Sequence, residues 1–135
     1  MPLTRDQLEA RAVRDYFLKV NDRDFDAIMA TFAPDCVMTI PTSGFEYRGH
    51  DALAKHFRDF LATFPKVEFS NFEVTADETT QRVAARFTVA LTGQDGVTTV
   101  LNNCNFFQAA PDGRFRHIVI YTSQPVKAGF EAGSD

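Results

Sequence analysis

The sequence predicts one α+β domain, in which helices come first along the chain and an antiparallel sheet follows. In the first half, apolar residues recur at three- and four-residue steps, which is typical of amphipathic helices. In the second half, runs of β-branched and aromatic residues alternate with short turn sequences, which is typical of strands. Helices followed by strands indicate an α+β layer fold. At 135 residues the chain is long enough for one hydrophobic core.

The first predicted helix covers residues 4–20. Thr4 and Gln7 have the spacing of a capping box, and Asn21 and Asp22 end the helix. The residues of its apolar face follow one another at helical steps, and they are Leu8, Ala12, Tyr16, Phe17 and Val20.

A second, shorter helix is predicted at 24–32, and Pro34 prevents its continuation. We then expect a strand at 36–40 and a loop at 41–49. A third helix runs from about residue 50 to 63 and ends before Pro65.

Four strands complete the predicted domain. Turn sequences rich in Gly, Asp and Pro separate them. The domain therefore covers residues 1–124, and the tail at 125–135 is expected to be loose. The four strands are predicted at 66–75, 81–91, 97–109 and 114–123.

Composition argues against several classes of protein. The net charge of −4 gives no basic face for nucleic acid or for an anionic membrane surface. The sequence contains no apolar run long enough for a membrane span, and the first residues lack the apolar core of a signal peptide. Cys36 and Cys104 do not form a disulfide framework. We therefore expect a cytoplasmic protein.

No motif for a cofactor or metal is found in the sequence. It has no glycine-rich phosphate loop and no nucleophile elbow. His50, His56 and His117 lie on different predicted elements, which is a poor arrangement for a metal. We expect neither a cofactor nor a metal. The 14 Phe residues and the absence of Trp suit either a thick apolar core or a cavity for apolar ligands.

Three segments together are similar to a known superfamily. They are NDRDFDAIMATFAPD at 21–35, GHDAL at 49–53 and the four-strand finish. The chain resembles the nuclear transport factor 2-like superfamily, and within it the SnoaL-like and ketosteroid-isomerase-like proteins. This resemblance implies a cone-shaped, curved antiparallel sheet packed on three N-terminal helices (a cystatin-like fold) and an internal pocket. It also implies a homodimer through the outer face of the sheet. The superfamily includes both enzymes and non-catalytic binders.

The resemblance places the functional positions of ketosteroid isomerase on this sequence. The tyrosine that donates to the substrate oxygen corresponds to Tyr16, and the protonated aspartate corresponds to Asn105, whose amide also donates. Two supporting tyrosines correspond to Phe32 and Phe57. The catalytic base corresponds to Ile40, just before Pro41, and isoleucine cannot take a proton.

His56 is the candidate that could replace the missing base. It borders the apolar stripe of the third helix, so it either faces the pocket or lies at the solvent edge. In an apolar pocket its imidazole would be neutral and able to accept a proton near pH 7.

Side-chain alternation assigns residues of the last two strands to opposite faces. With the register implied by the resemblance, Asn103 and Asn105 point inward, and His117 and Tyr121 point outward. A slip of one residue would exchange the faces. The remaining residues expected to line the pocket are Phe32, Met38, Ile40, Phe57, Phe64, Phe87, Val89, Ile118 and Ile120.

Two functions remain open at this point. In the first, the protein is an isomerase, cyclase or dehydratase that acts on an apolar carbonyl or polyketide-like compound. Tyr16 and Asn105 would then stabilise the oxyanion, and His56 would act as the base. In the second, the protein is a non-catalytic binder of apolar ligands, or an accessory subunit, that lacks the isomerase base at Ile40.

Overall fold

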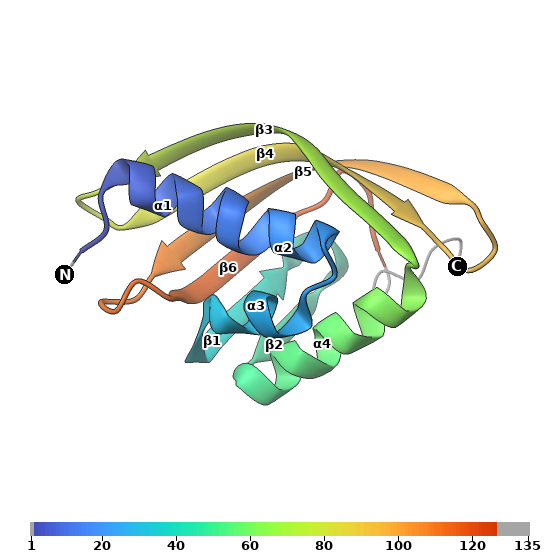
Figure 1. Ribbon diagram of the computed structural model, residues 1–135, viewed down its shortest axis with the longest axis horizontal. Coiled ribbons are helices and arrows are strands. Elements are labelled where there is room, and N and C mark those ends of the chain that lie inside the picture. Colours follow the sequence, from blue (N-terminus) through green and yellow to red (C-terminus); the bar gives the residue numbers. More distant parts are fainter. Residues whose placement is uncertain (1, 127–135) are drawn as a thin grey trace.

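Six strands form one strongly curved sheet in the order β2-β1-β6-β5-β4-β3 (Figure 1). The structure is a computed structural model and describes residues 2–126. The sheet is antiparallel except where β1 runs parallel to β6. The strands are β1 (Phe32–Ile40), β2 (Phe45–Arg48), β3 (Lys66–Asp77), β4 (Arg82–Thr92), β5 (Thr98–Ala109) and β6 (Phe115–Tyr121).

The helices cover one face of the sheet, which we call the inner face (Figure 1). The first helix lies under the arch of β3 and β4, and the last one packs on β1 and β2. Thr4 and Gln7 form the predicted capping box at the start of the first helix. The helical segments are α1 (Arg5–Ala12), a π-helical turn (Val13–Phe17), α2 (Leu18–Asn21), α3 (Phe25–Ala30), a 3-10 turn (Pro41–Ser43) and α4 (His50–Thr63).

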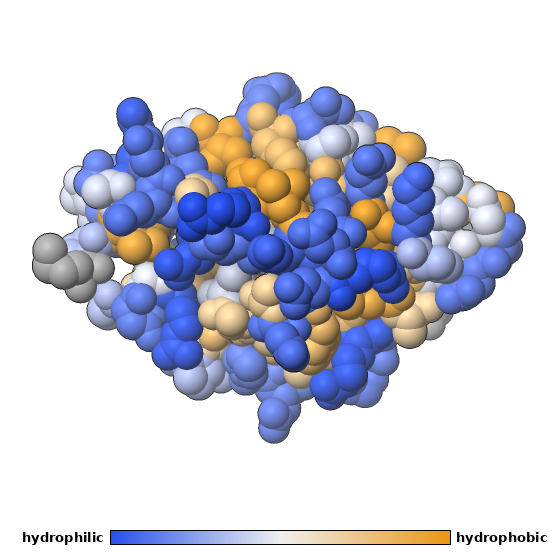
Figure 2. Space-filling model, in the orientation of Figure 1, coloured by the Kyte–Doolittle hydropathy of each residue, from blue (hydrophilic) through white to orange (hydrophobic). Residues whose placement is uncertain are grey.

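The hydrophobic core lies between the helices and the inner face. Strand residues alternate between buried and exposed, as in the pattern of β4 and β5. Aromatic rings dominate the centre, where Phe17 contacts the rings of Phe87 and Phe107 with centroids 4.6 and 5.7 Å apart. In Figure 2 polar residues cover most of the visible surface, with apolar atoms in smaller areas between them.

The fold class agrees with the sequence analysis, and several boundaries differ. The predicted loop at 41–49 contains β2, which forms a hairpin with β1. The predicted second helix ends at Ala30, and the chain enters β1 at Phe32, four residues before the expected start. The first helix is interrupted by the π-helical turn. Most of the expected tail at 125–135 lies outside the described residues.

Candidate functional site

A small cavity lies between the helices and the inner face of β3, β4, β5 and β6. Its volume is about 30 Å³. Aromatic and aliphatic side chains form most of its wall, and four residues contribute polar groups. The lining residues are Tyr16, His56, Phe57, Phe60, Phe69, Phe87, Val89, Leu91, Leu101, Asn103, Asn105 and Ile120.

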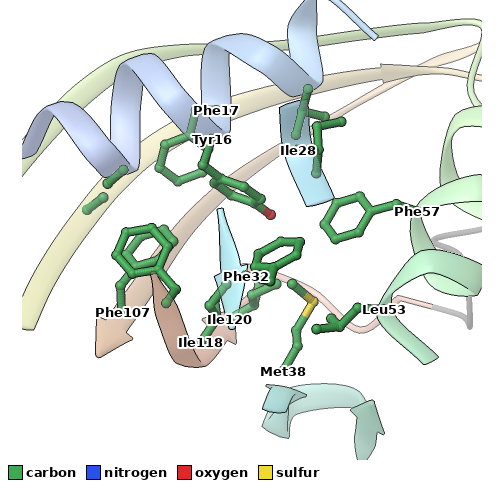
Figure 3. Packing of buried hydrophobic residues seen from close by; sticks show 14 of the residues in the cluster. Tyr16, Phe17, Ile28, Phe32, Met38, Leu53, Phe57, Phe107, Ile118 and Ile120 are labelled. Carbon is green, nitrogen blue, oxygen red and sulfur yellow. The ribbon is translucent and has the colours of Figure 1, made fainter. Parts of the chain in front are cut away.

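Tyr16 reaches the cavity from the π-helical turn. Residues spaced four apart on an α-helix drift around its axis, because one turn takes only 3.6 residues. The wider turn at Val13–Phe17 corrects this drift, so that Tyr16 and Phe17 are both buried. In Figure 3 the Tyr16 ring points toward Phe32 and Phe57, and the ring centroids are 5.8 and 6.1 Å away.

The Tyr16 hydroxyl is held in its neutral form. Its side chain is only 3% exposed, and burial, with the nearby Cys36 thiol, raises the pKa of Tyr16 well above its usual range. Within the described part of the chain this hydroxyl makes no hydrogen bond. The hydroxyl is thus available as a neutral donor.

Asn103 and Asn105 enter the cavity from β5, which is the face that the register implied by the family resemblance gave them. Both are buried. Asn102, which directly precedes Asn103 in β5, is exposed and faces outward. The Oδ1 atom of Asn103 accepts a hydrogen bond from the backbone amide of Ser123 at 3.2 Å. In contrast, Oδ1 of Asn105, a residue 2% exposed, has no hydrogen-bond partner among the described residues. The buried hydroxyl of Thr122 also lacks one.

His56 faces the cavity, so the sequence alternative of a solvent-facing histidine is wrong. It is 4% exposed and packs among the rings of Tyr47, Phe57 and Phe60, with centroids 4.4, 5.1 and 6.2 Å away. Burial lowers the pKa of His56 to about 4, although the nearby Asp59 carboxylate acts in the opposite direction. The imidazole is therefore neutral at physiological pH.

The other residues predicted for the pocket divide into two groups. Phe57, Phe87, Val89, Asn103 and Ile120 line the cavity. The second group is buried in the hydrophobic core and does not line the cavity, and it consists of Phe32, Met38, Ile40, Phe64 and Ile118.

Sequence reasoning missed several residues around the cavity. Phe60 lies on the apolar stripe of α4, and Leu101 shares a face with Asn103, so both could have been found from periodicity. Tyr47 packs on His56 from β2, and it was missed because its segment was interpreted as a loop.

The outer face of the sheet carries His117 and Tyr121, as predicted. Both are exposed, and Tyr121 contacts Phe106 edge to face with ring centroids 6.0 Å apart. A broad concave area on this face has a volume of about 1050 Å³ and includes Arg48, Arg82 and Arg116. It lies on the opposite side of the sheet from the cavity.

Of the residues that the structure describes, His56 is the one acidic or basic residue in the lining of the cavity. Among residues 2–126, no group of three or more His, Cys, Asp or Glu is placed to hold a metal ion. Within the same range, no helix combines the length and the apolar character needed to cross a bilayer.

Comparison with known proteins gives a family and a set of similar structures. The sequence model of the SnoaL-like domain matches residues 13–118. A search of curated proteins finds no match.

Among solved structures, a proposed polyketide cyclase from Xanthomonas campestris pv. campestris is 25% identical, with a TM-score of 0.76 over 87% of this chain and 90% of that chain. An epoxide hydrolase/cyclase-like enzyme with a role in pyran ring formation in the polyether salinomycin is 20% identical, with a TM-score of 0.78 over 87% and 92%. An epoxide hydrolase from M. tuberculosis is 22% identical, with a TM-score of 0.72 over 88% and 84%.

Proposed function

The chain belongs to the SnoaL-like domain family, and on this premise we propose that it binds an apolar small molecule in the cavity and acts on it as an isomerase, cyclase or dehydratase. One observation carries the proposal. Tyr16, His56 and Asn105 come from segments far apart in the sequence, yet they line one buried cavity. A mostly apolar wall with a few polar groups is how small-molecule sites are usually built.

Each of the three residues has a role in the proposed reaction on a carbonyl or polyketide-like compound. Tyr16 and the amide of Asn105 donate hydrogen bonds to the substrate oxygen as negative charge develops on it. One such donor contributes roughly 3 kcal/mol to stabilising the transition state. His56 is neutral and takes the proton from the neighbouring carbon.

The size of the cavity adds a requirement. Ligand sites usually have volumes of about 300–1,000 Å³, and this cavity has about 30 Å³. Substrate binding must therefore displace side chains of the wall. Phe69 is half-buried at the cavity and lies next to an irregularity in the β3–β4 pairing, so it is the side chain that we expect to move.

The test uses a reaction that needs no knowledge of the natural substrate. A base beside a bound ketone exchanges the protons next to the carbonyl for deuterium in D₂O. With 2-tetralone as the probe and NMR as the readout, we expect the protein to accelerate exchange. His56→Ala should lower this rate by about 100-fold or more and leave probe binding nearly unchanged.

His117→Ala is the matched control, because His117 is exposed on the outer face. It should exchange protons at the rate of the unchanged protein. Equal rates in the His56 and His117 variants would remove His56 from the mechanism. Native mass spectrometry of gently purified protein would in parallel identify an apolar molecule that co-purifies.

A second candidate function is binding without catalysis. Ile40 supports it, because this residue takes the place of the isomerase base and is fully buried in the core. The same probes separate the two functions. A non-catalytic binder would bind 2-tetralone and leave the exchange rate at the level of buffer.

For the oligomeric state, we infer that a second copy of the chain covers the outer face of the sheet. Phe106 and Tyr121 are each 46% exposed there and lie side by side. Such exposed aromatic residues are typical of interfaces.

Phe106→Arg should convert a dimer to a monomer in light scattering after size-exclusion chromatography. Val97→Arg, an exposed residue in the β4–β5 turn, is the control and should leave the dimer intact. A monomeric unchanged protein, or a stable complex with a different protein, would contradict this inference.

A further inference from the structure

The broad concave area on the outer face of the sheet, which includes Arg48, Arg82 and Arg116, has no part in the reaction proposed for the cavity. We call it the outer hollow. All six strands contribute to its wall, and its volume is about 1050 Å³. Small-molecule sites usually have volumes of about 300–1,000 Å³. The outer hollow is therefore large enough to hold a ligand without any movement of its wall.

Strand pairing aligns five residues of the outer hollow in one row across the sheet. From β2 to β4 they are Arg48, Val37, His117, Gln108 and Arg82. Neighbouring strands lie about 4.8 Å apart. Arg48 and Arg82 therefore stand at the two ends of the row, each two strands away from its middle on β6.

A β-bulge adds a third arginine at the middle of this row. Gln108 pairs with His117, and the next residue of β5 pairs with Phe115. Arg116 is therefore the extra residue of the bulge, where two residues of one strand oppose one residue of the other and a side chain is re-aimed. Arg116 is exposed and lines the outer hollow.

The three arginines keep hydrogen-bond donors that the protein does not use. Arg116 makes no ion pair with any described residue. Arg48 donates from Nε to Glu46 at 2.6 Å, and Arg82 donates from Nε to Gln108 at 2.7 Å. Within residues 2–126, the terminal nitrogens of Arg48 and Arg82 have no partner of this kind. These donors all face the same hollow of a chain whose net charge is −4.

The carboxylates of the outer hollow lie on its flanking strands and already have partners. Glu46 on β2 is paired with Arg48. Asp77 on β3 accepts hydrogen bonds from the amide and the hydroxyl of Thr80 at 3.2 and 2.6 Å. The described residues of β5 and β6, which form the middle, add no acidic residue to the wall. The middle of the hollow is therefore positive, and the acids at its sides favour a compact anion over a long one.

We propose that the outer hollow binds a compact anion with two or more negative charges, such as a diphosphate or a tricarboxylate, and that Arg116 lies at the centre of this site. The planar guanidinium group matches the oxygens of both phosphate and carboxylate groups. A single charge is balanced by Arg116 alone, whereas a multivalent anion also uses the terminal nitrogens of Arg48 or Arg82. This adds an anion site to the protein, and it does not depend on the function proposed for the inner cavity.

The anion site is compatible with the second copy inferred above. Phe106, on which that copy is inferred to pack, lies in the next row of the sheet, opposite Val119 and Ala84. It also lines the outer hollow. The second copy would therefore border the anion site, while the three arginines of the site come from one chain.

NMR titration of the full chain at pH 7 and constant ionic strength tests the proposal, with pyrophosphate, citrate and acetate as the probes. Pyrophosphate or citrate should bind saturably, shift the side-chain Nε signal of Arg116, and bind about 10-fold or more tightly than acetate. Tighter binding of pyrophosphate would identify a phosphate ligand, and tighter binding of citrate a carboxylate ligand. Arg116→Gln should weaken the binding by about 10-fold.

Arg5→Gln is the matched control, because it removes the same charge from an exposed residue of α1 outside the outer hollow. It should bind the anions as the unchanged protein does. Absence of binding, equal affinity for acetate and the multivalent probes, or equal weakening in the two variants would overturn the proposal, because equal effects indicate only general attraction to surface charge. None of these results changes the test of the inner cavity, which is read from proton exchange in 2-tetralone.

Discussion

At the scale of single residues, His56 couples the stability of the fold to pH. The folded protein keeps His56 neutral down to about pH 4, whereas the unfolded chain takes up a proton below its ordinary value of 6.5. Between these values the unfolded state binds more protons, so the free energy of unfolding falls as the pH falls. This stability is present at neutral pH and lost between about pH 6.5 and 4, and it amounts to on the order of 3 kcal/mol.

His56→Phe isolates this contribution, because phenylalanine fits an aromatic environment and does not titrate. Urea unfolding at pH 7 and pH 4.5 should show a smaller loss of stability in the variant than in the unchanged protein. All other titrating groups are common to both proteins and cancel. If the variant and the unchanged protein lose the same free energy of unfolding between pH 7 and pH 4.5, His56 is charged or exposed in the folded state.

Ile40 leads to a second prediction at this scale. Since Ile40 is fully buried and does not line the cavity, an aspartate there would lie in the core without a partner. Ile40→Asp should lower the free energy of unfolding by several kcal/mol, and it should not accelerate proton exchange. Ile40→Val, the control, should lose only about 1 kcal/mol. An aspartate variant as stable as the valine variant would show that water reaches this position.

Residue-level prediction from the sequence succeeded where a simple period applied. Alternation along β5 placed Asn103 and Asn105 on one face and Asn102 on the other, and the register implied by the family resemblance made the first face the inner one. The helical period could not decide whether His56 faces the pocket or the solvent. A residue at the border of an apolar helical stripe is buried only if a neighbouring element covers it. That element is β2, whose Tyr47 packs on the imidazole.

At the scale of elements, Asn21 joins the first helix to β3. Its Nδ2 donates to the carbonyl of Phe69 at 3.0 Å, and its Oδ1 accepts from the amide of Phe69 at 2.7 Å. This contact lies beside the irregular β3–β4 pairing, where Asn71 adopts a φ of 56°. Because β3 is an edge strand of the sheet, Asn21 satisfies two backbone groups of Phe69 at an edge where no further strand pairs, and it fixes the backbone of the segment carrying Phe69.

Asn21→Ala should lower the free energy of unfolding by about 1–3 kcal/mol, because both backbone groups of Phe69 lose their partner. Asn21→Asp keeps the acceptor and loses the donor, so its loss should be smaller. Urea unfolding gives these values. Hydrogen exchange at the Phe69 amide should become faster in the alanine variant, and unchanged exchange there would show that Asn21 does not fix this segment.

Two elements could not be predicted from the sequence for physical reasons. The π-helical turn has no composition of its own, and its buried residues follow the same spacing as a continuous α-helix. The strand β2 has only four residues, and its inner and outer positions are both partly exposed. Such a short strand is stabilised by its pairing with β1 more than by its own sequence.

At the scale of the whole molecule, the fold could be predicted because its two halves carry different periods. The helical period of the first half and the alternation of the second half require one layer of helices on one sheet. The parallel pairing of β1 with β6 could not be predicted from these two periods. It joins segments about eighty residues apart, and nothing local to either strand indicates its neighbour or its direction.

The same pairing has a consequence for how the chain folds. Strands β3, β4 and β5 pair with their neighbours in sequence and can assemble as hairpins, whereas β1 and β2 have no place in the sheet until β6 has been made. During synthesis β1 and β2 therefore stay unpaired with the rest of the sheet until the last tenth of the described chain has been made. Phe32 and Met38 remain unburied during this time. Closing such a long loop is slow. In the cell, the interval before β6 leaves the ribosome is when this protein is most exposed to aggregation and to chaperones.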